Sequence, residues 1–510
     1  MKRTLSLILV LAMIASLAIF TPASAASAKD SVVVGCAAEP DCFFPGHSKL
    51  STNMDEVPIL HNVYESLIKL GPNNEREPLL ATEWSVSEDG KVYTVKLREG
   101  VKFSNGNDFN AEDAAFALNL YGPSPNGAAQ LGNYDYTEAL DEYTIAIHLT
   151  DPYAPFLNAL AGRYALMFDK ETYEEVGEDG LNEHPIGTGP YLFTERVSGN
   201  YVKLDYNPNY WGGEPAIKHV TWRVLTDTNT QMIALESGEI DVLTRANIAA
   251  LQNLMSDQVI WQAKDASSIE NLLFNCAVAP ANDINFRKAV QYAINKADIN
   301  IGVFNGAATE GDISIAPGFS GRPDAGTYEV IEYNPEKAKE YLAASNYNGE
   351  PFVIATVSGS SDEVSAQIIQ GQLIEIGINC QVNAMDASTY NDATASGAFN
   401  ATNRFGGVSV LDADGMYYTW NKANATKNGA IFDTMRFSDE LDQLMIDGRK
   451  GTDDAERKAI YAKACNIITE NAWGITIFYD VNAVAYNRDL NGVVARSLNG
   501  LYFFNDWYWN

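Results

Sequence analysis

The chain has 510 residues, of which 46% are hydrophobic, and its formal net charge at pH 7 is −31. This length has room for more than one domain, and this apolar content is enough for sizeable cores. So large a negative charge repels nucleic acids and anionic lipid headgroups, which argues against a nucleic-acid partner.

The N-terminal segment has the pattern of an export signal. Two basic residues, Lys2 and Arg3, precede an apolar run over residues 5–20, and the small residues 23–25 follow. This order is typical of a secretory signal peptide with a small-residue cleavage site. We therefore expect residues 1–25 to be a signal peptide and the protein to be exported, to the periplasm or the outer face of the cytoplasmic membrane.

Five cysteines and five histidines are present. No two cysteines form a C-x-x-C motif and the histidines lack the spacing of metal ligands, so we expect no metal site and no cofactor. An exported chain can form disulfides, and Cys36 and Cys42 are close enough in sequence to bridge a small loop. The sequence leaves open whether these two thiols are bridged.

The first predicted elements are a strand, a helix and a hairpin. Residues 31–35 form a short apolar run, as a buried strand does, and residues 57–67 have helical periodicity. Residues 84–86 and 92–97 alternate apolar and polar side chains, which predicts two half-buried strands. Asn110 precedes two acids and several small apolar residues, so a capped helix is expected to begin there.

The stretch from residue 82 to residue 120 contains many fixed points. They are Trp84, Asp89-Gly90, Tyr93, Leu97-Arg98, Gly100-Val101-Lys102-Phe103, Gly106 and Ala111-Glu112-Asp113. In order and spacing this pattern resembles the family 5 extracellular solute-binding proteins, the peptide, nickel and oligosaccharide receptors of ABC importers. A GTGPY turn at 187–191 and an NPNYW turn at 207–211 extend the resemblance.

Later segments predict a second α/β unit. A strand is expected at 272–275, an amphipathic helix at 283–296 and a β-α-β run between residues 352 and 382. A helix over 454–471 then precedes a strand over 473–479.

The resemblance implies an α/β, two-lobed, hinge-closing fold of the type II periplasmic-binding-protein kind, with an additional inserted α+β domain. The chain would cross between the lobes near residues 266–276 and return near residue 480. The expected parts are a signal peptide at 1–25, lobe I at 30–65, 181–270 and 481–510, an inserted domain II at 66–180, and lobe III at 271–480.

The segment 403–414 matches a ligand-binding loop of the family. In peptide-binding members this loop hydrogen-bonds an extended ligand through its backbone and carries an aromatic residue. Phe405 stands at that aromatic position here and is followed by Gly406 and Gly407. Arg404 could pair with a ligand carboxylate through two parallel hydrogen bonds, or with one of the many nearby acids.

The same segment departs from the family at one position. Val408 stands where peptide-binding members carry the aspartate that pairs with the peptide amine. Asp412 or Asp414 could substitute for that aspartate from a shifted loop. Alternatively, the ligand has no free amine.

Other candidate ligand-binding residues lie outside this loop. By the resemblance, Arg245 matches a wall position of the cleft, and Glu39 and Asp41 match the loop opposite. Tyr417 and Trp420 could stack on a sugar or flank a peptide side chain, or they could belong to the core.

We therefore expect a monomeric, exported binding protein that is not an enzyme. It would capture an oligopeptide or similar small oligomer between two lobes and deliver it to an ABC permease. An oligosaccharide-binding subunit is the first alternative, and a secreted hydrolase is the alternative from another class. The absence of G-x-S-x-G and H-E-x-x-H motifs argues against the hydrolase.

Overall fold

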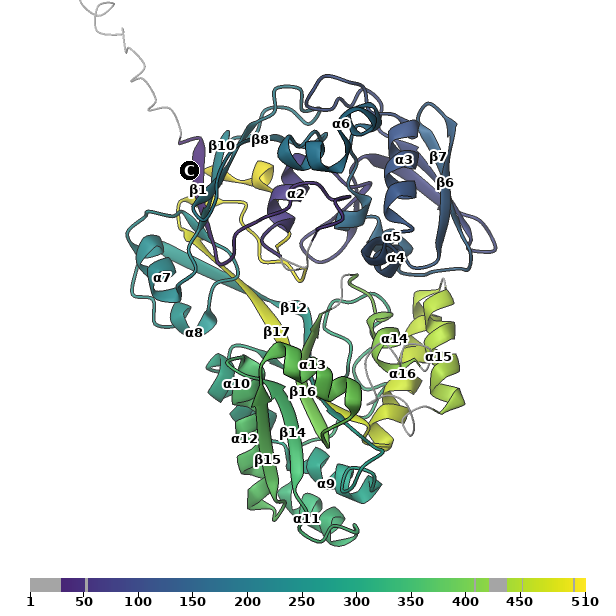
Figure 1. Ribbon diagram of the computed structural model, residues 1–510, viewed down its shortest axis with the longest axis vertical. Coiled ribbons are helices and arrows are strands. Elements are labelled where there is room, and N and C mark those ends of the chain that lie inside the picture. The colour runs from purple at the N-terminus through teal and green to yellow at the C-terminus, as the bar shows by residue number, and fades with distance from the viewer. Residues whose placement is uncertain (1–28, 51–53, 408–409, 422–437, 452, 499) are drawn as a thin grey trace, which may run out of the picture.

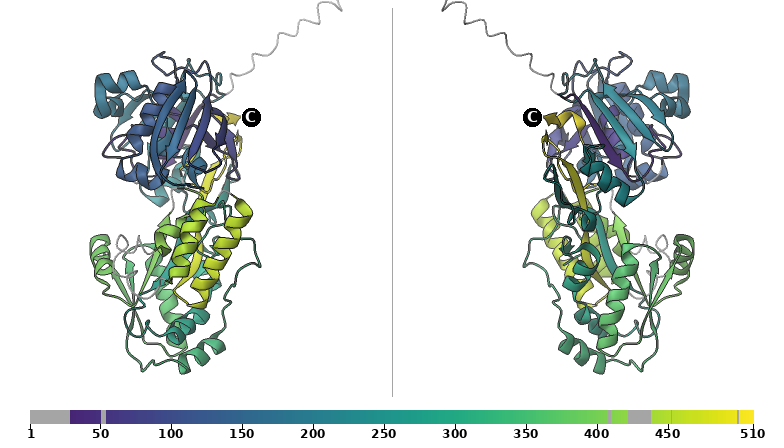
Figure 2. Two further views of the ribbon diagram at one scale, coloured as in Figure 1. Left: turned by 90° about the vertical axis from the view of Figure 1, so that its right-hand side faces the viewer. Right: turned by 90° about the vertical axis from the view of Figure 1, so that its left-hand side faces the viewer.

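The computed structural model describes residues 29–50, 54–407, 410–421, 438–451, 453–498 and 500–510. The predicted signal peptide and Val408 therefore lie outside the described residues. The described chain forms an upper and a lower half, joined by the long strands β12 (Val259–Phe274) and β17 (Gly474–Asn487) (Figure 1). Side views show the two halves stacked along the long axis of the molecule (Figure 2).

One mixed sheet of eleven strands runs through both halves, in the order β15-β14-β16-β12-β17-β11-β1-β10-β9-β8, with β13 paired to β17. β1 is parallel to β10 and β11, and β14 is parallel to β15 and β16. Parallel pairs covered by helices are typical of α/β proteins. Besides β12 and β17, the strands are β1 (Ser31–Cys36), β8 (Tyr191–Val197), β9 (Tyr201–Tyr206), β10 (His219–Val224), β11 (Val242–Leu243), β13 (Thr309–Glu310), β14 (Phe352–Val357), β15 (Cys380–Met385) and β16 (Ala401–Gly407).

β12 and β17 each serve both halves of the molecule. In the upper half, β11 pairs with Ala485 and Tyr486 of β17, whereas in the lower half β16 pairs with residues 268–274 of β12. The register between β12 and β17 shifts between Asp265 and Ile269. Such an irregularity bends a strand locally, so the two halves are connected by a pair of strands with a bend between them.

The sequence predicted only the end of β12, at 272–275, whereas the strand begins at Val259. The helix expected at 57–67 is also shorter, since α2 spans Val57–Val63. The domain boundaries implied by the resemblance stay a prediction.

Helices lie around the strands in both halves of the molecule (Figure 1). In the upper half they are α2, α3 (Ala111–Tyr121), α4 (Pro125–Leu131), α5 (Phe156–Ala159), α6 (Lys170–Glu183), α7 (Thr228–Glu236) and α8 (Ile248–Leu251). In the lower half they are α9 (Ile284–Ala293), α10 (Lys296–Phe304), α11 (Pro335–Ala343), α12 (Ser361–Glu375), α13 (Ala387–Ser396), α14 (Gly415–Trp420), α15 (Asp439–Lys450) and α16 (Asp454–Glu470).

A second, four-stranded antiparallel sheet lies in the upper half, in the order β4-β5-β7-β6. Its hairpin and the helix α3 confirm the elements predicted there. The Asn110 side chain accepts a hydrogen bond from the backbone of Glu112, and Asp113 accepts one from the backbone of Asn110, which together form a capping box. The strands are β4 (Ala81–Val86), β5 (Val92–Leu97), β6 (Tyr134–Asp141) and β7 (Thr144–Leu149); the short pairs are β2 (Ile68–Leu70) with β3 (Arg76–Pro78) and β18 (Leu490–Asn491) with β19 (Tyr508–Trp509).

All five cysteines are buried free thiols, so the possible bridge between Cys36 and Cys42 is not present. The two thiols face different carbonyl groups. Cys36 Sγ lies 3.3 Å from the carbonyl oxygens of Ala38 and Arg223, whereas Cys42 Sγ lies 3.6 Å from that of Phe44. Burial raises the pKa of the Cys36 thiol well above its ordinary value and that of Cys42 to about 11, so both thiols stay protonated and poorly reactive.

Candidate functional site

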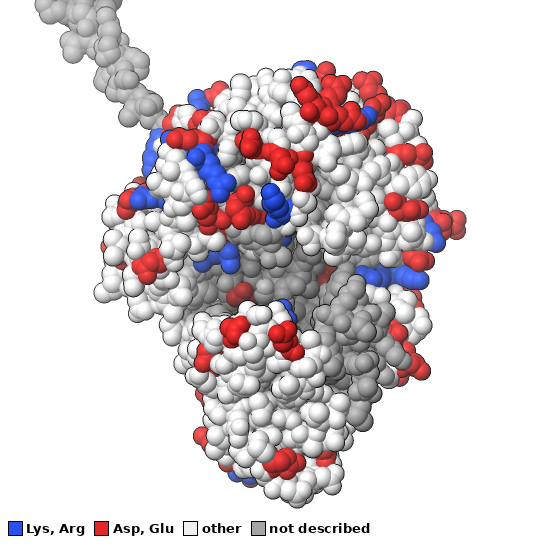
Figure 3. Space-filling view, in the orientation of Figure 1, with Lys and Arg blue, Asp and Glu red and all other residues white. Residues whose placement is uncertain are grey.

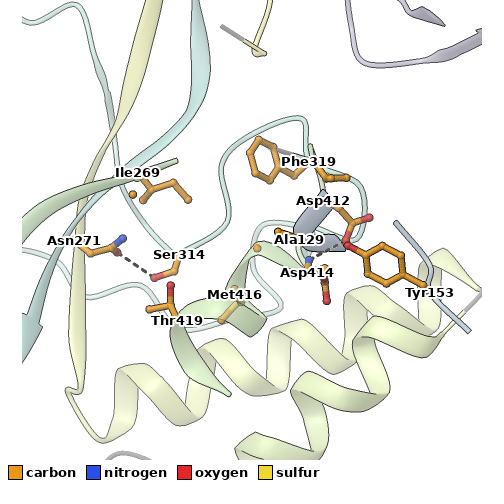
Figure 4. Close-up of a pocket in the computed structure, with 13 residues that line it drawn as sticks. Ala129, Tyr153, Ile269, Asn271, Ser314, Phe319, Asp412, Asp414, Met416 and Thr419 are labelled. Atoms are coloured by element: carbon orange, nitrogen blue, oxygen red, sulfur yellow. Dashed lines mark hydrogen bonds between the residues drawn. The ribbon is translucent and has the colours of Figure 1, made fainter. Parts of the chain in front are cut away.

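A cavity of about 260 Å³ lies between the two halves, and both contribute to its walls (Figure 4). The upper half supplies one residue of α4 and one that precedes α5. The lower half supplies parts of β12, β16 and α14, the segment between β13 and α11, and the loop before α14. The described residues that line it are Ala129, Tyr153, Ile269, Asn271, Ser314, Phe319, Gly406, Val410, Asp412, Asp414, Gly415, Met416 and Thr419. The space-filling view shows the surface hollowed between the two halves (Figure 3).

The two carboxylates of the cavity are each paired with an arginine. Asp412 is fully buried and accepts hydrogen bonds from Arg457 Nη1 and Nη2 at 3.1 and 2.5 Å. Asp414, whose side chain is 3% exposed, accepts from Arg449 Nε and Nη2 at 3.0 and 2.9 Å. An arginine already neutralises each carboxylate, which argues against Asp412 or Asp414 as the partner of a ligand amine. Their roles as ligand contacts stay predictions.

A group of neutral polar side chains forms one side of the cavity. Asn271 Oδ1 accepts hydrogen bonds from Ser314 Oγ at 3.1 Å and from Thr476 Oγ1 at 2.9 Å. Within the described residues, Asn271 Nδ2 has no hydrogen-bond partner, and Asn271 lies on the cavity wall. The amide therefore offers a donor to a bound molecule.

Apolar side chains form the rest of the wall. Ile269, Phe319 and Met416 surround the centre of the cavity, and Tyr153 reaches it from the upper half (Figure 4). The ring of Tyr153 is buried and lies 5.1 Å from the guanidinium of Arg449. The cavity is therefore mainly apolar, with a few fixed polar groups, which is the usual character of a small-molecule site.

β16 places Arg404 on the same face of the sheet as the cavity. Arg404 pairs with Asn271 across the two strands, and Gly406 pairs with Ile269, and directly opposite residues share one face of a sheet. Arg404 is exposed, and its guanidinium lies 6.0 Å from the ring of Tyr390. No carboxylate of the described residues pairs with it, so the ion pair that the sequence left open is absent there.

The remaining predicted residues lie outside the described cavity wall. Arg245 Nη1 is 3.5 Å from Asp55, and Glu39 accepts a hydrogen bond from Arg196 at 2.9 Å, which lowers the pKa of the Glu39 carboxyl. Asp41 is exposed. Their roles as ligand contacts stay predictions.

The two aromatic candidates differ in burial. Tyr417 is half-buried, and the centre of its ring lies 3.8 Å from the guanidinium of Arg449, the partner of Asp414. Trp420 is fully buried in the core, which was the second interpretation of this residue, and it presents no surface for stacking. For Phe405 and Gly407 the structure places only the backbone, which belongs to β16.

Sequence reasoning missed most of the cavity wall. Asn271, Ser314, Phe319 and Tyr153 were not among the candidates, and they come from segments up to 166 residues apart (153 to 319). Gly406, Asp412 and Asp414 were among the candidates and do line the cavity, whereas no sequence pattern pointed to the other four residues.

Among the described residues, no group of three or more histidine, cysteine or acidic side chains is arranged to hold a metal ion. In the same part of the chain, no helix combines the length and apolar character that a bilayer span requires.

Comparison with known families identifies the architecture. The family described as "Bacterial extracellular solute-binding proteins, family 5 Middle" matches residues 75–428. The chain belongs to this family. Its members are non-enzymatic components of transporters, so the chain is a solute-binding subunit of an ABC importer and not an enzyme. The family acts outside the cytoplasm, which agrees with the coarse prediction of export.

Individual relatives match nearly the whole of this family 5 protein. The glutathione-binding protein GsiB of Escherichia coli (strain K12) is 29% identical over 459 residues, which cover 85% of this chain and 86% of that protein. The periplasmic binding protein DppA of Helicobacter pylori, solved with the peptide STSA, is 27% identical with a TM-score of 0.75 and covers 95% of this chain and 98% of that one. The oligopeptide-binding protein AppA of Bacillus subtilis, solved with a nonapeptide, is 23% identical with a TM-score of 0.73 and covers 95% and 99%. The predicted family and fold class are thus confirmed.

Proposed function

We propose that this family 5 protein captures an oligopeptide or similar small oligomer in the cavity between its two halves and delivers it to an ABC permease. It would work as a monomer, in the periplasm or at the outer face of the cytoplasmic membrane. One observation carries the proposal: both halves contribute to the walls of the same cavity, and the long strands β12 and β17 join these halves.

The arrangement of β12 and β17 supports closure about a hinge. Their shared register is interrupted between Asp265 and Ile269, where the strands pass from one half to the other. Rotation about a few residues at such a point closes periplasmic binding proteins around their ligands. Closure here would bring Tyr153 of the upper half toward Ile269 and Phe319 of the lower half and would remove water from a bound solute.

Peptides are the class of solute that we favour. The relatives named above bind glutathione, the peptide STSA and a nonapeptide, all of which contain peptide bonds. The strand β16 reaches the cavity wall at Gly406, and Asn271 Nδ2 offers a donor to a carbonyl oxygen. Both groups suit a ligand with backbone-like polar atoms.

The test is a thermal-shift screen of the purified protein, after refolding to remove co-purified ligand, against a tripeptide mixture and an oligosaccharide mixture. A peptide at 100 times its dissociation constant should add about 2.7 kcal/mol to the free energy of unfolding. Small-angle scattering should then show a smaller radius of gyration, and mass spectrometry should recover the peptide unchanged. Stabilisation by oligosaccharides alone would refute the peptide assignment.

A further inference from the structure

We infer that the cavity between Tyr153 and Met416 is a subsite for one uncharged, mainly apolar group of the captured solute. This inference rests on the proposed function and adds the chemical class of the group that enters. It follows from the size of the cavity, from the pairing of its two carboxylates with arginines, and from the Asn271 amide donor, which has no partner among the described residues.

The size of the cavity fits a single side chain. Its volume is about 260 Å³, and a cavity of about 150 Å³ in another protein is large enough to hold benzene. Tyr153, Ile269, Phe319 and Met416 form apolar walls around this space (Figure 4). The flexible Met416 side chain can adjust to groups of different outline. The cavity is therefore large enough for an aromatic ring or a branched aliphatic group that carries one polar substituent.

The charges of the wall exclude a charged group. Among the described residues that line the cavity, Asp412 and Asp414 are the only carboxylates, and none is basic. Arg457 and Arg449 neutralise these two carboxylates through bidentate pairs. A ligand ammonium would find no carboxylate oxygen without an arginine. A ligand carboxylate would find no cation within the wall, because Arg404, the exposed arginine on this face of the sheet, is not among the lining residues. Either charge would lose its hydration without compensation, which is costly in a closed site.

On the polar side of the wall, the Asn271 amide offers a hydrogen bond of fixed direction. Ser314 and Thr476 both donate to Asn271 Oδ1, which leaves Nδ2 as the group that faces a ligand. An amide nitrogen donates and does not accept. The entering group is therefore mainly apolar, with an acceptor such as a hydroxyl or carbonyl oxygen at the Asn271 end.

The experiment uses the mature protein and a matched set of tripeptides. Each tripeptide has alanine at two positions and phenylalanine, leucine, lysine or glutamate at the third, and each of the three positions is varied in turn. Isothermal titration calorimetry should find one position at which phenylalanine and leucine bind at least tenfold more tightly than lysine and glutamate.

Gly406 provides the variant that links this preference to the cavity. Gly406 lines the cavity, and a Cβ there would meet no described atom within 4 Å, so a side chain added at this site enters open space. Gly406→Val should weaken binding of the preferred phenylalanine peptide at least tenfold and by more than it weakens binding of trialanine, and Gly406→Ala should have the same effect in weaker form. Gly371→Val is the matched control, because Gly371 also has open space but lies exposed on α12, away from the cavity.

The outcomes separate the two proposals. If peptides bind but charged and apolar residues bind equally at every position, or if Gly406→Val leaves the phenylalanine peptide unaffected, the subsite is refuted and the peptide-binding function stands. If no peptide binds to the wild-type protein, the proposed function fails and the subsite fails with it.

Discussion

Replacing Asp412 by asparagine should destabilise the protein strongly without changing its shape. The side chains of Asp412 and Arg457 are 0% and 4% exposed, and both arginine Nη atoms donate to the carboxylate. Asparagine keeps the size and one acceptor oxygen but removes the negative charge. Arg457 cannot leave its place easily, because its Nε also donates to the carbonyl oxygen of Gly448 at 2.8 Å. The variant therefore keeps a buried guanidinium without a counter-ion.

The expected loss follows from the burial of this pair. Breaking a buried ion pair by removing one partner costs about 3–5 kcal/mol, because the remaining charge is desolvated and uncompensated. An exposed pair is worth only about 0–1 kcal/mol. The pair between Lys96 and Glu83 is 62% and 70% exposed, so Glu83→Gln provides the control with a small expected effect.

The measurement is urea denaturation followed by circular dichroism and by tryptophan fluorescence. The double variant Asp412→Asn/Arg457→Met should recover part of the loss, because it leaves no unpaired charge in the core. The reasoning would be refuted if Asp412→Asn unfolded at the same urea concentration as the wild type. It would also be refuted if the double variant lost more free energy of unfolding than its two single variants lose together.

Three further predictions follow from buried groups elsewhere. Burial raises the pKa of Glu65 from its ordinary value of 4.5 to about 7, so the free energy of unfolding should fall by about 3 kcal/mol as the pH rises through this interval. Glu65→Gln should remove this pH dependence in denaturation curves between pH 4 and 8, and parallel curves for the two proteins would contradict it. Gly492 has φ +81° and a Cβ there would lie 2.0 Å from the carbonyl oxygen of Asp506, so Gly492→Ala should lower the melting temperature far more than Gly100→Ala, where φ is +74° and no described atom lies within 4 Å. The five buried thiols should not react with Ellman's reagent in the folded protein, and all five should react once the protein is unfolded, without prior reduction. If the unfolded protein had to be reduced before its thiols reacted, the free-thiol structure would be contradicted.

Local patterns were sufficient to predict the hairpin and the capped helix, but not the full length of β12. The hairpin at 84–97 alternates in polarity, and Asn110 is followed by the acids that complete its capping box. The first half of β12 contains Gln262, Lys264 and Asp265 and lacks such alternation. It is extended because it pairs with residues 481–487 of β17, more than two hundred residues away. Strand formation of this kind depends on the partner, and a single sequence does not show the partner.

The same limit decides what could be inferred about the binding site. Asp412 and Asp414 are visible in the sequence as acids within a ligand-binding loop, and in a chain with a net charge of −31 they suggest a site for a cation. Their arginine partners lie on α15 and α16, 35 and 45 residues further on, so only the fold shows that both charges are already neutralised. Asn271 likewise becomes a donor to the cavity only because Ser314 and Thr476 occupy its oxygen. The acidity of this protein therefore says little about the charge of its solute, and the pairing inside the cavity argues for an uncharged group at this position.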